Sequence, residues 1–137
     1  MDAPHTQLKG TILLVEDDEL LSRAYREGFE KAGIAVIAAT DGAEAEEILE
    51  EVKPDIIVLD LVMPVKNGFE VLEDIRNKKE EYRHIPVVVL SVLAERDDIE
   101  SAHELGAIDY LIKSQFSMQE VIDRITEHVR AARKEHA

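Results

Sequence analysis

The stretch "DIIVLDLVMP" (55–64) decides the fold and also raises the functional question. Four consecutive apolar residues, Ile56 to Leu59, precede the carboxylate of Asp60 and the pair Met63-Pro64. A short continuous apolar run predicts a strand that is covered on both faces, as in a parallel sheet. Why such a strand should end on a charged residue depends on which other groups reach that carboxylate.

Four further apolar runs have a similar length: "TILLV" (11–15), "IAVIAA" (34–39), "VVVL" (87–90) and "DYLI" (109–112). Between the runs, apolar residues recur at three- and four-residue spacing, which predicts helices. The first helix follows Asp18 and closes at Gly33, and the second begins near Asp41. The third is marked by Val71, Leu72 and Ile75, and the fourth by Ile99, Ala102 and Leu105, stopping at Gly106. The last opens with the capping box "SMQE" (117–120). Five strand–helix units predict an α/β fold, a parallel sheet doubly wound with five helices.

The chain length of 137 residues predicts one domain. We expect an N-terminal extension over 1–10, the main domain over 11–132 and a tail over 133–137, with no room for a separate output module. The longest polar connection is "NKKEEYRHIP" (77–86), whose Pro86 is expected to set the entry to the fourth strand.

Composition excludes several functional classes. A net charge of -14 disfavours direct nucleic-acid binding, because such proteins carry a basic patch. The basic run "RAARK" (130–134) is explained by its place at a helix C-terminus. There are 0 cysteines, so there is neither a disulfide framework nor a thiol-based metal site. With no signal peptide and no membrane-length apolar run, the expected location is the cytoplasm.

Polar groups follow four of the five predicted strands. In folds of this class the site lies outside the carboxyl ends of the strands, so these groups are expected to converge. The residues at those ends are Glu16, Asp17, Asp18, Asp60, Ser91 and Lys113.

Each group also has an ordinary structural explanation. Asp17 or Asp18 could cap the next helix, and Asp60 could join a turn with Asn67-Gly68. Ser91 could bond to its own loop, and Lys113 could extend to solvent from an edge strand.

The convergence itself favours chemistry. Several carboxylates at one place repel one another unless a cation binds, and ligands that are all oxygen favour Mg²⁺. An aspartate beside that cation can attack phosphorus, while a lysine and a hydroxyl stabilise the phosphoryl charge.

The sequence resembles the receiver domain of two-component response regulators from about residue 10 to residue 130. The stretches that carry the resemblance are "ILLVEDD" (12–18), "DIIVLDLVMPVKNGFEVL" (55–72), "VVVLS" (87–91) and "GAIDYLIK" (106–113). The resemblance implies a flavodoxin-like fold with strand order 2-1-3-4-5. It also implies that the chain is a stand-alone receiver that accepts a phosphoryl group on Asp60 from the phosphohistidine of a sensor histidine kinase or a histidine phosphotransfer protein.

The resemblance assigns the remaining site residues. It implies that Asp17 and Asp60 bind Mg²⁺, with Glu16 assisting through water and the backbone carbonyl of Val62 completing the shell. Ser91 takes the position of the switch hydroxyl and Lys113 that of the family's lysine. Asp18 is expected to cap a helix, and Gly68 to support the turn after the acceptor.

Tyr110 has two interpretations. An aromatic residue on an edge strand is commonly half-buried packing. The resemblance implies instead that phosphorylation draws Ser91 towards the phosphoryl group and that Tyr110 rotates into the vacated space. This would reshape the face formed by the fourth helix, the fifth strand and the fifth helix. A protein target or a phosphorylation-dependent dimer would bind there, or the group would be relayed to a histidine phosphotransfer protein.

Several positions depart from the family pattern. Ser114 stands where a proline with a cis peptide bond is usual, and a non-proline cis bond costs about 2.5–4 kcal/mol. The loop therefore either accepts that strain or takes another path. Val92 replaces a small residue and could narrow access to the site. Val62 and Leu93 are apolar and cannot orient a water molecule, which predicts slow loss of the phosphoryl group.

Rival functions are less well supported. A hydrolase of the haloacid dehalogenase kind needs a second aspartate two residues after the nucleophile, where this chain has Val62. We therefore expect no enzyme activity beyond the chain's own phosphorylation and dephosphorylation. No phosphate-binding glycine motif follows a strand, which argues against a nucleotide site. The histidines show no metal-ligand spacing, and His103 and His128 are expected to be solvated or edge residues.

Overall fold

The computed structural model describes residues 9–78 and 80–135. Its strands are β1 (Gly10–Val15), β2 (Ile34–Ala39), β3 (Ile56–Leu59), β4 (Val87–Ser91) and β5 (Asp109–Ile112). Its helices are α1 (Glu19–Lys31), α2 (Gly42–Glu51), α3 (Gly68–Lys78), α4 (Glu80–Arg83), α5 (Arg96–Glu104) and α6 (Met118–Glu135), with a 3₁₀ turn over Lys113–Gln115.

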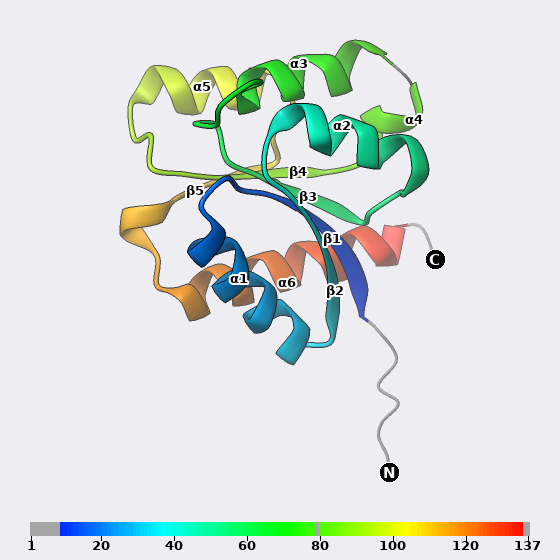
Figure 1. Ribbon diagram of the computed structural model, residues 1–137, viewed down its shortest axis with the longest axis vertical. Helices are drawn as coiled ribbons and strands as arrows, with labels where there is room; N and C mark the ends of the chain where they lie inside the picture. Colours follow the sequence, from blue (N-terminus) through cyan, green and yellow to red (C-terminus); the bar gives the residue numbers. More distant parts are fainter. Residues whose placement is uncertain (1–8, 79, 136–137) are drawn as a thin grey trace.

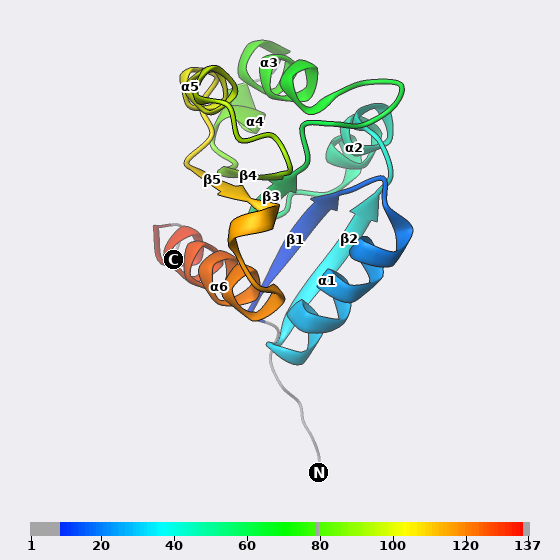
Figure 2. The ribbon, with the colours of Figure 1, turned by 90° about the vertical axis from the view of Figure 1, so that its left-hand side faces the viewer.

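The five strands form one parallel sheet in the order β2-β1-β3-β4-β5. This confirms the α/β fold class and the strand order implied by the resemblance. Helices α1 and α6 cover one face of the sheet, and α2, α3 and α5 cover the other (Figures 1 and 2).

Two apolar cores follow from this layering, because successive side chains of a strand point to opposite faces. In β1, Leu13 and Val15 belong to the core under α2, α3 and α5, whereas Ile12 and Leu14 belong to the core under α1 and α6. Strand β3 divides in the same way, with all four residues buried. The apolar runs of β1, β3 and β4 are therefore strands buried on both faces, whereas the edge strands β2 and β5 are only partly buried.

Helix starts agree with the capping signals in the sequence. The carboxylate of Asp18 accepts from the N–H of Leu21 at 3.1 Å, and that of Asp41 accepts from Glu44 at 2.8 Å. Ser117 and Glu120 form the expected reciprocal capping box, with hydrogen bonds of 2.8 and 3.1 Å. All three predicted helix starts are confirmed.

The polar connection 77–86 was predicted without a helix, and this was wrong. Helix α3 extends to Lys78, and the short helix α4 follows at Glu80–Arg83. Among the side chains of α4 that the structure describes, only Tyr82 is buried, so a single turn offered no apolar period to detect.

The expected ends of the domain also differ slightly from the elements. Strand β1 begins at Gly10 and α6 ends at Glu135, so both pass the predicted limits of 11 and 132. Residues 1–8 of the expected extension and 136–137 of the expected tail lie outside the described residues. Among the helices described, none combines the length and the apolar character needed to cross a bilayer.

Candidate functional site

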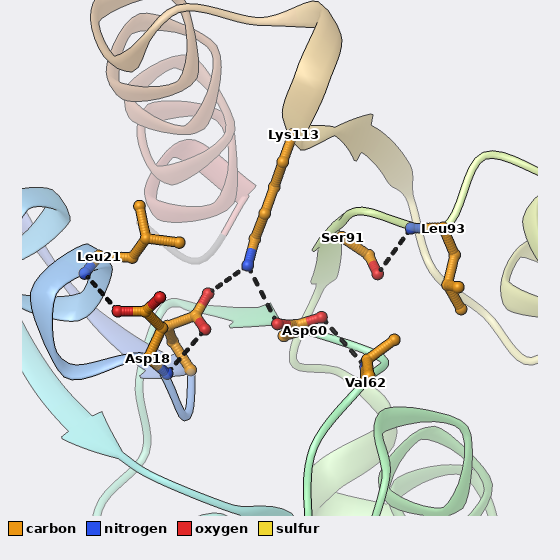
Figure 3. A network of polar contacts seen from close by, with 8 residues as sticks. Asp18, Leu21, Asp60, Val62, Ser91, Leu93 and Lys113 are labelled. Atoms are coloured by element: carbon orange, nitrogen blue, oxygen red, sulfur yellow. Dashed lines mark hydrogen bonds and ion pairs between the residues drawn. The ribbon is translucent and has the colours of Figure 1, made fainter.

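The carboxyl edge of the sheet gathers the polar groups that the sequence singled out. Pairing brings the ends of β1 and β3 level, since Val15 lies opposite Leu59, and the ends of β4 and β5 level, since Ser91 lies opposite Ile112. Glu16, Asp60 and Lys113 each follow the last residue of a strand. Figure 3 shows Lys113 pointing from beyond β5 towards Asp60.

Three carboxylates form the acidic centre of this site. Glu16, Asp17 and Asp60 each offer an oxygen atom within 4.8 Å of the others. Glu16 is only 2% exposed and Asp60 only 5%, whereas Asp17 is open to solvent. Carboxylates this close repel one another, and a cation beside them relieves that repulsion. A set of oxygen ligands with one open side suits Mg²⁺ or Mn²⁺.

Lys113 supplies part of that neutralisation. Its Nζ donates to Glu16 Oε1 at 2.6 Å and to Asp60 Oδ2 at 3.1 Å, and its side chain is 12% exposed. The interpretation that Lys113 extends to solvent is therefore wrong. No cis peptide bond occurs in the described chain, so the loop with Ser114 takes another path, a 3₁₀ turn, and the lysine still reaches the acidic centre.

Burial and charge oppose each other at both ends of this ion pair. Burial raises the pKa of Glu16 above its ordinary value, although the hydrogen bonds from Lys113 and from the N–H of Asp18 lower it. Burial lowers the pKa of Lys113, but its hydrogen bond to Glu16 and the charge of Asp60 outweigh this, and that pKa is raised. The ammonium is thus held in its charged form beside the carboxylate of Asp60.

The remaining acid, Asp18, caps α1 and is not part of the three-carboxylate group. Its own N–H donates to Glu16 Oε2 at 3.0 Å. Glu16 therefore receives Lys113 on one oxygen and the main chain on the other, which fixes the orientation of its carboxylate.

The chain after Asp60 turns within a confined space. Asp60 Oδ1 accepts from the N–H of Val62 at 3.1 Å, and the N–H of Gly68 donates to the carbonyl of Leu61 at 3.1 Å. A Cβ atom at position 68 would lie 2.4 Å from the carbonyl oxygen of Asp60, so only glycine fits. Gly68 supports the turn, as expected, and Asn67 instead caps α3 by exchanging hydrogen bonds with Glu70.

Ser91 and Tyr110 meet at one residue of the β4–α5 loop. Ser91 Oγ accepts from the N–H of Leu93 at 3.3 Å, and the hydroxyl of Tyr110 donates to the carbonyl of Leu93 at 2.8 Å. The ordinary explanation for Ser91, a bond to its own loop, is confirmed for this structure. Tyr110 is half-buried against the core, and burial raises the pKa of its hydroxyl.

The sequence missed two clusters of charged residues. His128 was expected to be a solvated or edge residue; it is partly exposed, and its Nε2 lies 2.8 Å from Asp109 Oδ2, where Arg124 Nε also donates at 3.0 Å. The four-residue spacing of Arg124 and His128 on one helix face was a signal for this. Lys66 pairs with Glu46 of α2 and Asp74 of α3, contacts that no pattern in the sequence indicates.

The comparisons with known sequences and with solved structures agree on one protein family. The sequence model of the response regulator receiver domain matches residues 12–126. The alkaline phosphatase synthesis transcriptional regulatory protein PhoP of Bacillus subtilis is 39% identical over 83% of this chain and 46% of its own length. The chain spans about half the length of the curated relatives it matches.

Solved structures agree with the sequence relatives. The receiver domain of the Francisella response regulator 1452 is 30% identical, with a TM-score of 0.79 over 89% of this chain and 98% of that one. The Mn²⁺-bound form of response regulator Rcp1 is 31% identical, with a TM-score of 0.72 over 89% of this chain and 90% of that one.

Proposed function

The chain belongs to the response regulator receiver family of two-component signalling, and we propose that Asp60 is its phosphoryl acceptor. One observation carries the proposal: Lys113 Nζ bridges Glu16 and Asp60 at 2.6 and 3.1 Å, at the centre of the acidic group. A lysine held against a buried aspartate can neutralise the charge of an incoming phosphoryl group.

The donor in this proposal is a phosphohistidine of a sensor histidine kinase or of a histidine phosphotransfer protein. An oxygen of the Asp60 carboxylate attacks phosphorus as the N–P bond of the donor breaks. The electron pair of that bond remains on the imidazole, and Asp60 becomes an acyl phosphate. Lys113 would then form an ion pair with one phosphoryl oxygen, and the hydroxyl of Ser91 would donate a hydrogen bond to another.

The acidic group fits a divalent cation, and we propose that this is Mg²⁺. Asp17, Asp60 and, through water, Glu16 would hold it, with the backbone carbonyl of Val62 as a further ligand. When bound, the ion would offset the negative charge that builds up on the phosphoryl oxygens. The Mn²⁺-bound form of Rcp1 supports a divalent cation at such a site.

We propose no turnover of external substrates. A phosphatase of the haloacid dehalogenase kind would need an acid two residues after Asp60, where Val62 presents an apolar side chain instead. The chain would catalyse only its own phosphorylation and the loss of that group. A cytoplasmic location also stays a prediction.

The output is proposed to be a protein contact through α5, β5 and α6. Tyr110 lies on β5, and its hydroxyl is hydrogen-bonded to Leu93, in the loop that leads to α5. Because Ser91 is hydrogen-bonded to the same Leu93, a movement of Ser91 can alter this face. A protein target or a second copy of the chain would bind there after phosphorylation.

Incubation with acetyl phosphate and Mg²⁺, followed by intact mass measurement, tests the proposal. The wild type should gain one phosphoryl group that Asp60→Asn does not gain and that EDTA abolishes. Equal labelling of both proteins would place the acceptor elsewhere. No labelling of either would mean that Asp60 does not accept the group.

A further inference from the structure

The segment from Leu61 to Asn67, here called the acceptor loop, contains a strained residue. Val65 has φ of +67°, in the left-handed region that β-branched residues avoid. The residue is 83% exposed, so packing offsets little of this cost. Such a conformation persists only where neighbouring contacts enforce it.

The next residue, Lys66, makes such contacts: its N–H donates to the carbonyl of Pro64, across Val65, at 2.7 Å. Its Nζ lies 2.7 Å from Glu46 Oε2 of α2 and also pairs with Asp74 of α3. All three side chains are partly buried. Hydrogen bonds to Asp74 and Glu46 raise the pKa of Lys66, so its charge is retained between two carboxylates that would otherwise repel each other.

The main chain of Lys66 is attached as well. Its carbonyl accepts from the N–H of Gly42, the first residue of α2, at 3.2 Å. A Cβ atom at position 42 would lie 2.6 Å from that carbonyl, so glycine allows the loop to approach the helix. Lys66 therefore joins the acceptor loop to α2 through its main chain, and to α2 and α3 through its side chain.

The acceptor loop begins at the phosphorylation site. The N–H of Val62 donates to Asp60 Oδ1, and Gly68 closes the loop on Leu61. A movement of Lys66 would therefore be transmitted through a few residues to the carboxylate that is proposed to bind the metal.

We propose that Lys66 is a positioning residue for this site: its pairing with Glu46 and Asp74 keeps Val65 left-handed and thereby holds Val62 against Asp60. The inference rests on the proposed function. Without Lys66, Val65 would relax, the loop would shift, and the divalent site would lose its shape.

Mn²⁺ binding provides the test, because electron paramagnetic resonance counts the free ion directly. Lys66→Met should weaken Mn²⁺ binding about fivefold. Lys66→Arg, which keeps the charge, should stay within about twofold of the wild type. Asp74→Asn gives a second route to the same loss if Lys66→Met folds poorly. Arg133→Met, which removes the ion pair with Asp55 at the opposite edge of the sheet, is the matched control and should not change binding.

Coupling between Lys66 and Val65 separates positioning from simple stability. Val65→Gly removes the strain, so Lys66→Met should cost less than about twofold in that background. Equal losses in both backgrounds would overturn the link to Val65. If Lys66→Met keeps the wild-type fold, the amide protons of Gly42 and Gly68 should exchange faster in this variant than in the wild type.

The outcomes also separate this inference from the proposed function. If the wild type binds Mn²⁺ and Lys66→Met and Asp74→Asn bind it equally well, the positioning role is wrong and the site stands. If the wild type binds no Mn²⁺, the proposed metal site itself fails.

Discussion

Ser91 and Tyr110 are both hydrogen-bonded to the main chain of Leu93, one to its N–H at 3.3 Å and the other to its carbonyl at 2.8 Å. A group that draws Ser91 away removes the partner of the Leu93 N–H. The same residue then carries the disturbance to Tyr110, which lies on a different strand.

Phosphorylation should therefore expose the Leu93 amide. If Ser91 Oγ turns to the phosphoryl group, the Leu93 N–H loses its acceptor and its hydrogen exchange should accelerate about tenfold. Exchange measured by NMR with and without acetyl phosphate checks this. Asp60→Asn is the control, and an unchanged rate in the phosphorylated wild type would contradict the coupling.

Gly68→Ala should damage both folding and the site. The added Cβ would meet main-chain atoms, the Asp60 carbonyl at 2.4 Å and Leu61 Cα at 2.7 Å, which cannot move cheaply. We expect a loss of about 1–3 kcal/mol in the free energy of unfolding, measured with urea, and slower phosphorylation.

Gly28→Ala is the matched control for that change. There the nearest atom is Ile122 Cδ1 at 2.7 Å, the flexible end of a side chain. A cost at position 28 equal to that at position 68 would mean that the contact with Asp60 is not what requires glycine.

Phosphoryl lifetime should depend on position 62. Val62 cannot orient water, so Val62→Asn is expected to speed dephosphorylation about tenfold or more. A polar residue could also be placed at Leu93, but Leu93 packs against the core, so Leu93→Glu would lower the stability of the fold as well. Val62→Asn alone therefore tests phosphoryl lifetime without that added effect. Ile108→Asn is the matched control, because Ile108 and Val62 are each 49% exposed, and it should leave the rate unchanged. Equal rates for wild type and Val62→Asn would refute the slow-release hypothesis.

Asp109 should contribute acid-sensitive stability. Burial raises its pKa, but the hydrogen bonds from His128 and the N–H of Tyr110, together with the charge of Arg124, outweigh this, and the pKa lies below its ordinary 3.8. A lowered pKa means that this stability is present above pH 3.8 and is lost as pH falls through the folded-state value.

Urea titrations between pH 2 and 7 test this, with Asp109→Asn losing about 1–2 kcal/mol at neutral pH. The difference from wild type should shrink as the solution is acidified below about pH 4. Asp123→Asn, an exposed change on α6, should follow the wild-type curve. A difference for Asp109→Asn that is independent of pH would assign the loss to packing instead of charge.

Local patterns were enough to predict the strands, the helix starts and the polar groups at the strand ends. A buried strand needs an apolar run, so the residues Ile56–Leu59 predict a strand by themselves. A helix start needs a cap, so Ser117 predicts the start of the last helix. A parallel sheet brings the carboxyl ends of its strands together, so the fold class alone predicts that Glu16 and Asp60 lie close to each other.

Features that depend on distant segments could not be predicted in this way. Whether Lys113 points to solvent or to Asp60 is decided by the turn at Ser114, and the sequence left both open. Lys66 gave no signal, because its partners Glu46 and Asp74 are adjacent only after α2 and α3 pack. Helix α4 was missed since one turn buries too little to produce a period.

The Glu16–Lys113 contact spans 97 positions of the chain, and the Lys113–Asp60 contact spans 53. During translation, Asp60 therefore leaves the ribosome before the lysine that completes its surroundings. On the proposed function, a nascent or truncated chain that contains Asp60 but lacks Lys113 would not accept a phosphoryl group from its kinase. The chain would thus accept the phosphoryl group only once the sheet is complete. Incomplete copies of the receiver would then take no part in signalling.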